Sequence, residues 1–178
     1  MKKALFLDRD GIINVDFGYV HQIKDFEFVD GIFDICRYAQ DMGYELIVIT
    51  NQAGIARGYY QIEDFEKLTG WMKAEFKKQE VDIQGVYYCP HHPDKGDNEY
   101  VITCECRKPA PGMILKAAKE HGINLAHSAF IGDKVSDMQA ADNAGIHNKI
   151  LVSSQYQDDQ HTHAHRINNI KEAAAFLC

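Results

Sequence analysis

The sequence has no apolar stretch of the roughly 18 to 20 residues that a transmembrane helix requires. Positive charge is also scarce, because 19 Lys and Arg stand against 26 Asp and Glu and give a net charge of -7. A protein with this charge does not attract a nucleic-acid backbone at long range, so any anionic ligand must be held by local groups. The first residues pass directly into an apolar segment without the features of an export signal. We therefore expect a cytoplasmic, monomeric protein that binds neither nucleic acid nor membrane.

The cysteines are few and odd in number, five in all, which suits metal binding better than a disulfide framework. Cys36 lies on an apolar helical face and Cys178 ends the chain, whereas the other three fall within 18 residues. Cys89, His91, Cys104 and Cys106 supply three thiolates and an imidazole, which is a complete tetrahedral zinc set of the structural type. Ordering so long a loop costs about 1 to 2 kcal/mol per residue, and structural zinc can contribute on the order of 10 kcal/mol. We predict a zinc loop over about 89–106 rather than free thiols in an unstructured insertion.

The chain is long enough for one domain, which we expect over 1–178, and 46% of its residues are hydrophobic. Short apolar runs alternate with segments of helical periodicity, without an internal repeat. The patterns predict strands over 4–7, 45–50, 83–88, 129–132 and 150–152, and helices over 32–42, 63–76, 111–121 and 137–144, the last capped by Ser136. The polar stretch 153–169, with His161, His163 and His165, is expected to be a solvated loop before a weakly packed terminal helix over 170–177. The simplest topology is an α/β, Rossmann-like doubly wound parallel sheet.

Polar residues end three of the predicted strands. Asp8, Thr50 and Asp133 each follow a short apolar run, and ligands of parallel sheets bind at the carboxyl ends of the strands. Asp8 and Asp10 are two residues apart, so in extended backbone they point the same way, and their repulsion requires a cation or a proton. Together with Asp133 they form an oxygen-rich set that suits Mg²⁺ and a phosphoryl group. Taken alone, the Asp-x-Asp-Gly string is more typical of a turn.

Basic residues stand beside these positions. Arg107 and Lys108 directly follow the zinc ligand Cys106, and Lys134 directly follows Asp133. Such side chains can neutralise and recognise phosphate oxygens. In an acidic chain we interpret them as part of a phosphate site rather than as solvated surface charge.

These residues carry a family resemblance. The run Asp8-Arg9-Asp10-Gly11, then Thr50, Lys108 and Gly132-Asp133-x-x-x-Asp137, resembles the four motifs of the haloacid dehalogenase-type (HAD) phosphatases. More narrowly, the segments 18–21, 26–31, 50–58, 88–93, 106–109 and 132–134 are similar to those of the D-glycero-D-manno-heptose 1,7-bisphosphate 7-phosphatases. The likeness covers about residues 1–152. It implies a phosphatase acting on a small phosphorylated sugar, without a large cap domain and with a zinc loop.

The resemblance also implies roles for individual residues. Asp8 would be the nucleophile that forms an aspartyl-phosphate, and Asp10 the acid and base. Magnesium would be held by the carboxylates of Asp8 and Asp133 and by the backbone carbonyl of Asp10. Thr50 and Lys108 would donate to phosphoryl oxygens, and Asp137 would support the site. The residues implied to contact the substrate are Asp16, Phe17, Gly18, Tyr19, Thr50, Asn51, Gln52, Ala53, Arg107, Lys108 and Lys134.

One position departs from the family pattern, and other functions stay open. Ala53 stands where the family usually has serine, so a hydroxyl donor is lost and substrate preference could differ. Histidinol-phosphate phosphatase is an alternative, because related proteins share the motifs and the zinc loop. A phospho-acceptor module would also use Asp, Thr and Lys around Mg²⁺, but Asp10 argues for ester hydrolysis. A zinc-ribbon nucleic-acid binder is opposed by the charge of -7 and the single zinc set.

Overall fold

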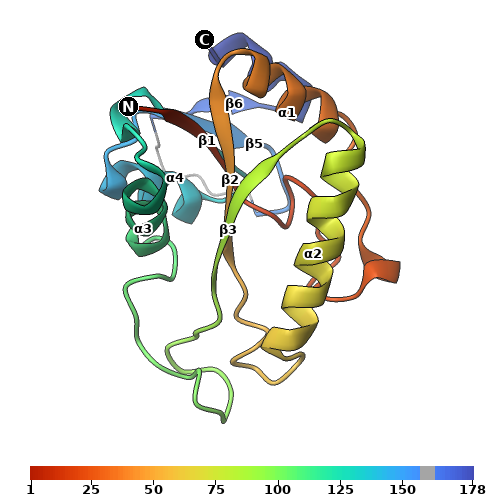
Figure 1. The fold of residues 1–178 in the computed structure, drawn as a ribbon. Helices are drawn as coiled ribbons and strands as arrows, with labels where there is room; N and C mark the ends of the chain where they lie inside the picture. The colour runs from red at the N-terminus through yellow and green to blue at the C-terminus, as the bar shows by residue number, and fades with distance from the viewer. Residues whose placement is uncertain (157–162) are drawn as a thin grey trace.

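Six parallel strands form the centre of the molecule in the computed structural model, which describes residues 1–156 and 163–178 (Figure 1). The strands are β1 (Lys3–Leu7), β2 (Tyr44–Asn51), β3 (Ile83–Cys89), β4 (Ala129–Gly132), β5 (Asn148–Val152) and β6 (His165–Ile167). They pair in the order β3-β2-β1-β4-β5-β6. The chain therefore builds outward from β1 in one direction and then crosses to its other side. This reversal places the topological switch point between β1 and β4, where ligands of open α/β sheets bind.

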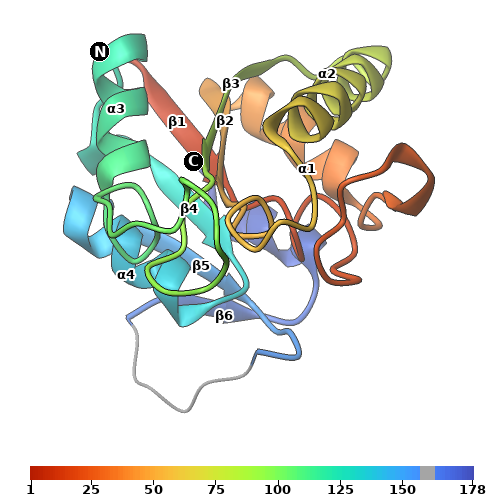
Figure 2. The same cartoon turned by 90° about the horizontal axis from the view of Figure 1, so that it is seen from below.

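Helices cover both faces of the sheet (Figures 1 and 2). One face carries α1 (Ile32–Asp41) and α2 (Ile62–Lys78), and the other carries α3 (Gly112–His121) and α4 (Val135–Ala144). Short 3₁₀ helices lie at Ile23–Asp25, Leu125–His127 and Ile170–Phe176. Successive residues of β1 face opposite sides, so Leu5 and Leu7 join one apolar core while Ala4 and Phe6 join the other. The doubly wound α/β fold predicted from the sequence is confirmed.

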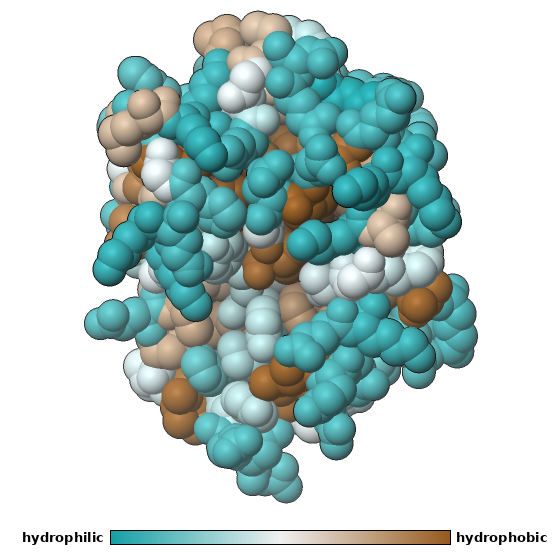
Figure 3. Space-filling model, in the orientation of Figure 1, coloured by the Kyte–Doolittle hydropathy of each residue, from teal (hydrophilic) through white to brown (hydrophobic). Residues whose placement is uncertain are grey.

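Loops gather at the carboxyl edge of the sheet, which Figure 2 shows from below. The long segment after β3 lies at this end, and both chain termini lie at the opposite end in Figure 1. Leu7 pairs in register with Ile131, so the residues that follow β1 and β4 leave the sheet side by side. Figure 3 shows a surface that is mostly hydrophilic on the face in view, with apolar atoms in small separate patches. Within the described ranges, no helix combines the length and the apolar character that crossing a membrane would take.

The structure corrects three expectations for the second half of the chain. Residues 165–167 form the edge strand β6 instead of a loop, and the His165 ring stacks on Phe176 at 4.1 Å between centroids. Residues 170–176 form a 3₁₀ helix that is not weakly packed, because Ile170 and Ala173 are buried in the core beside α1. Lys134, not Ser136, occupies the N-cap position of α4. His163 lies within the described residues, whereas His161 lies outside them.

Candidate active site

A buried lysine joins two carboxylates at the carboxyl edge of the sheet. Lys108 Nζ lies 2.9 Å from Asp8 Oδ1, which directly follows β1, and 2.6 Å from Asp137 Oδ1 in the first turn of α4. It also donates to the carbonyl oxygen of Ile49 in β2 at 3.0 Å. Two hydrogen bonds and one ion pair therefore hold this ammonium group and tie β1, β2 and α4 together.

The charges of this cluster shift one another's protonation. Burial raises the pKa of Asp8 to about 6, and the Asp137 carboxylate adds to the rise while Lys108 opposes it. Burial also acts against the charge on Lys108, but Asp137 and Asp8 outweigh it and raise the pKa of the lysine. The lysine is therefore fixed as a cation, and the carboxylates are in excess over it.

Asp133 brings a third carboxyl group to this site. It follows β4 and is 3% exposed, and within residues 1–156 and 163–178 neither of its carboxylate oxygens accepts a hydrogen bond. Burial raises its pKa to about 9, with further contributions from Asp8 and Asp137. One oxygen from each of the three aspartates lies within 4.8 Å of the others. A divalent cation fits this set, because it would satisfy oxygens that the protein leaves without a donor.

Gly11 makes room for Asp133. A Cβ atom at Gly11 would stand 2.1 Å from Asp133 Oδ2, and the backbone there has φ of +92°. Both features restrict this position to glycine. The glycine of the Asp-x-Asp-Gly string therefore lets the segment after β1 approach the carboxylate after β4.

Asp10 lies outside this carboxylate cluster and is held by donors of its own. Its Oδ1 accepts hydrogen bonds from Arg9 Nη2 at 2.8 Å and from Asn14 Nδ2 at 3.1 Å, and its Oδ2 accepts one from Gln52 Nε2 at 3.3 Å. The Arg9 guanidinium is 2% exposed and also donates to the carbonyl oxygen of Val20. Asp8 and Asp10 thus have separate partners, which suits two carboxylates with different tasks.

A cleft of about 300 Å³ opens beside Asp10. Its lining includes eight of the residues predicted to contact substrate: Asp16, Gly18, Tyr19, Asn51, Gln52, Ala53, Arg107 and Lys134. Thr50 and Lys108 are buried and are not part of the lining. Phe17 is 63% exposed and is not brought into the cleft, so its contact with substrate stays a prediction.

The cleft also contains residues that the sequence did not indicate, among them Gly54, Tyr60 and Tyr156. The Tyr156 hydroxyl donates to Asp16 Oδ2 at 2.7 Å, and the Lys134 ammonium lies 4.2 Å from the centre of its ring. Asp16 and Tyr156 are 140 residues apart. No local pattern connects residues so distant, so this contact could not be read from the sequence.

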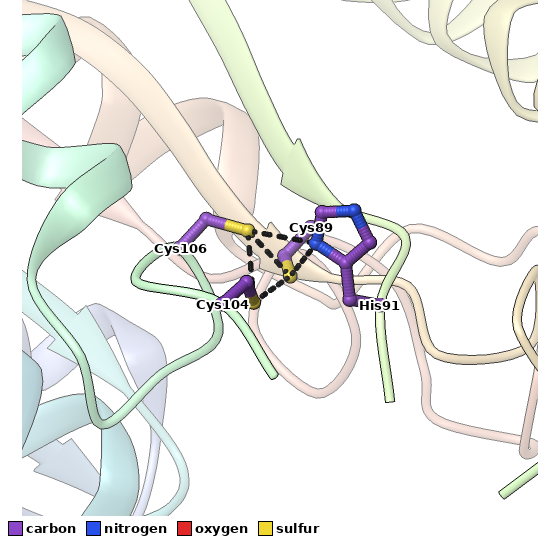
Figure 4. A group of neighbouring side chains, drawn as sticks. All are labelled: Cys89, His91, Cys104 and Cys106. Carbon is purple, nitrogen blue, oxygen red and sulfur yellow. Dashed lines mark hydrogen bonds between the residues drawn. The ribbon is translucent and has the colours of Figure 1, made fainter. Parts of the chain in front are cut away.

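The four predicted zinc ligands converge at one point (Figure 4). The sulfur of Cys106 lies 2.8 Å from that of Cys89 and 3.2 Å from that of Cys104, and His91 Nδ1 lies 3.3 Å from the Cys106 sulfur. All ligand atoms fall within 4.8 Å of one another, and the cysteines are not paired in disulfides. Three sulfurs and one imidazole nitrogen so arranged could hold a metal ion, and their softness favours zinc over magnesium.

The cysteine loop packs onto the loop that follows β2. Asn98 Nδ2 donates to the carbonyl oxygen of Ile55 at 2.8 Å. A Cβ atom at Gly96 would lie 1.8 Å from the carbonyl oxygen of Ala56, so the two backbones are in close contact. Cys106, the last of the four candidate ligands, directly precedes Arg107, which lines the cleft. A metal in this loop would therefore order two walls of the cleft.

Comparisons with known proteins agree with this geometry. A family model described as HAD-hydrolase-like matches residues 105–173. The chain is 53% identical over 149 residues to the D-glycero-beta-D-manno-heptose-1,7-bisphosphate 7-phosphatase of Yersinia pestis, with 84% of this chain and 79% of that protein covered. The enzyme of the same name from Escherichia coli K12 is 52% identical, with 84% and 78% covered.

A solved structure is also similar. It is the D,D-heptose 1,7-bisphosphate phosphatase of B. bronchiseptica, complexed with magnesium and phosphate. It matches with a TM-score of 0.83 and 26% identity, over 97% of this chain and 96% of that one. The likeness therefore extends over almost the whole of both chains.

Proposed function

The chain belongs to the family of the HAD-type D-glycero-beta-D-manno-heptose-1,7-bisphosphate 7-phosphatases, and we propose that it removes the 7-phosphate of D-glycero-D-manno-heptose 1,7-bisphosphate. The observation that carries the proposal is the meeting of Asp8 and Asp133 within 4.8 Å beside the buried Lys108. A nucleophile, a cation and a candidate metal site are thus concentrated at the end of β1. Such a site can attack phosphorus and stabilise the charge that develops on the phosphoryl oxygens.

The first half of the reaction transfers the phosphoryl group to Asp8. Its Oδ1 accepts from the backbone N–H of Arg9 and from Lys108, which leaves Oδ2 as the attacking oxygen. As the bond between Asp8 and phosphorus forms, the ester bond breaks and the sugar oxygen leaves with a proton from Asp10. Thr50 and Lys108 donate to the phosphoryl oxygens, where the added charge of the transition state is spread.

The second half returns Asp8 to its free form. A water molecule attacks phosphorus and gives its proton to Asp10, the bond between phosphorus and Asp8 breaks, and inorganic phosphate leaves. Asp10 thus serves as acid and then as base, which its position outside the Lys108 cluster allows. Magnesium, held by Asp8, Asp133 and the backbone carbonyl of Asp10, would supply electrostatic stabilisation of the phosphoryl charge.

The substrate's sugar occupies the cleft beyond Asp10 in this proposal. Asp16 and the segment 18–19 face it from one side, Asn51, Gln52 and Ala53 from another, and Arg107 and Lys134 offer positive charge to the second phosphate. A structural zinc bound by the three cysteines and His91 would hold Arg107 in place. We propose that a monomer with a single domain is sufficient, because every group invoked comes from one chain. We also propose that the protein works in the cytoplasm, where its thiols stay reduced.

Phosphate release with defined variants tests this function. We expect the purified protein with Mg²⁺ to convert the 1,7-bisphosphate to the 1-phosphate, as followed by ³¹P NMR. Asp8→Asn and Asp10→Asn are expected to lower turnover by at least about 100-fold, because each loses a group that makes or breaks a bond. Substantial turnover by folded, metal-loaded Asp8→Asn protein would refute the nucleophile assignment.

A parallel assay separates the proposed substrate from the alternatives. The relatives favour the sugar bisphosphate over histidinol phosphate, so kcat/KM should be highest for the bisphosphate. Equal or better hydrolysis of histidinol phosphate would assign the chain to the other substrate. A stable phosphorylated protein without turnover would favour the phospho-acceptor module.

A further inference from the structure

Gln52 links the two groups that flank the phosphoryl site. Gln52 is only 3% exposed. Its side-chain Nε2 donates to Thr50 Oγ1 at 2.9 Å and to Asp10 Oδ2 at 3.3 Å. Both N–H bonds of the amide are therefore used. The amide makes the Thr50 oxygen an acceptor, and the threonine hydroxyl itself donates to the carbonyl oxygen of Asn51 at 3.4 Å, a long contact that a phosphoryl oxygen can replace.

The other end of the amide is held by a tyrosine. The Tyr60 hydroxyl donates to Gln52 Oε1 in a short hydrogen bond. Because a hydroxyl donor faces Oε1, the oxygen of the amide points away from Asp10 and the NH₂ group points toward it. The reverse orientation would set an amide oxygen against the Asp10 carboxylate, where two acceptors repel.

Packing fixes the tyrosine ring in turn. Tyr60 is 6% exposed and lies in an apolar cluster with Ile55 and Phe65. The His21 ring stacks on it with centroids 4.8 Å apart and planes 7° apart. A Cβ atom at Gly54 would stand 2.2 Å from the Tyr60 ring, which shows how closely the backbone approaches it. The hydroxyl therefore has little freedom to leave Gln52.

We propose that Tyr60 is a positioning residue that acts through Gln52 to orient Asp10 for proton transfer to the leaving group. The inference rests on the proposed phosphatase activity and adds to it a residue outside the four motifs. Asp10 must deliver its proton to the leaving oxygen as the ester bond breaks. A small displacement of the acid costs rate without preventing phosphate from binding, because proton transfer depends steeply on geometry.

The test compares leaving groups. An alkyl phosphate needs a proton on its leaving oxygen, whereas p-nitrophenolate leaves without one. For Tyr60→Phe we expect kcat/KM for the alkyl phosphate to fall about 5- to 20-fold, a fraction of the full contribution of a general acid. For p-nitrophenyl phosphate the fall should be less than about threefold, and the inhibition constant of inorganic phosphate should stay within about twofold, because proton delivery and not binding is affected. The control is Tyr59→Phe, at the adjacent and 52% exposed tyrosine, which should behave as the wild type.

A double variant shows whether the tyrosine acts through the amide. In the Gln52→Ala background, Tyr60→Phe should cause no further loss, because the connection to Asp10 is already broken. Losses that multiply, equal losses with both leaving groups, or an unchanged kcat/KM for the alkyl phosphate would each overturn the proposal. Wild-type turnover of another alkyl phosphate but not of the heptose bisphosphate would refute the proposed substrate while leaving these ratios measurable. Absence of all wild-type phosphatase activity would refute both.

Discussion

Removing the charge of Lys108 should destabilise the protein strongly, because its ammonium is 3% exposed and lies between Asp8 and Asp137. Replacement of Lys108 by Met keeps much of the side chain's volume but leaves two buried carboxylates facing each other. Breaking a buried ion pair by removing one partner costs about 3 to 5 kcal/mol. For a chain of this length each kcal/mol shifts Tm by about 2 to 4 °C, so Tm should fall by about 6 to 20 °C.

The effect should depend on pH in a defined direction. The pKa of Lys108 is raised above its usual value of 10.5, so its stabilising contribution is fully present below about 10.5 and is lost only as pH rises further. In Lys108→Met, acidification protonates Asp8, whose pKa burial already raises to about 6, and so relieves its repulsion with Asp137. The difference in Tm from the wild type should therefore be smaller at pH 5 than at pH 8.

The assay is urea and thermal unfolding of both proteins in magnesium-free buffer, together with phosphatase activity. Lys119→Met, at an exposed lysine of α3, is the matched control and should change the free energy of unfolding by less than about 0.5 kcal/mol. Activity of Lys108→Met should fall at least about 100-fold, because a donor to the phosphoryl group is lost. A destabilisation below about 1 kcal/mol at pH 8 would show that the buried lysine is not needed to neutralise the cluster.

Three further predictions concern the metals. Because the pKa values of Asp8 and Asp133 are raised from 3.8 to about 6 and about 9, the metal-free folded form binds protons more tightly and loses stability as pH rises from about 4 to 9. Mg²⁺ should therefore raise Tm more at pH 8 than at pH 5, and equal shifts would contradict this. Gly11→Ala should abolish the Mg²⁺-dependent rise in Tm without changing the zinc content, since its Cβ would lie 2.1 Å from Asp133 Oδ2; a normal Mg²⁺ response would refute the close approach. Elemental analysis should find about one zinc per chain and much less in Cys104→Ser, whose zinc loop should become protease-sensitive; a fully active zinc-free protein would count against the loop's role.

Much of the fold could be predicted because it is encoded locally. Strand and helix positions follow from the spacing of apolar residues, and the five core strands lie where that spacing predicts them. Edge elements were predicted less well. The run His165–Ile167 has no strand pattern of its own and becomes a strand only because β5 offers unpaired backbone groups beside it.

The candidate site divides in the same way. The strand-end positions of Asp8 and Asp133 and the spacing of the cysteine ligands were visible in the chain, since each depends on a strand end or on a short motif. The pairing of Lys108 with Asp137 was not visible, although both residues belong to recognisable motifs. Their contact depends on how α4 sits on the sheet, which local spacing does not describe.

The sequence by itself therefore determined which residue types this protein can use: carboxylates at strand ends, a lysine after a cysteine pair, and four soft metal ligands. Only the tertiary structure decided which of them touch. It placed β4 beside β1, so that Asp8 and Asp133, which are 125 residues apart in the sequence, meet. It also set the Tyr60 hydroxyl against Gln52. The physical reason is that periodicity and motifs record the preferences of neighbours along the chain, whereas contacts between distant segments are selected by the packing of whole elements against a shared core.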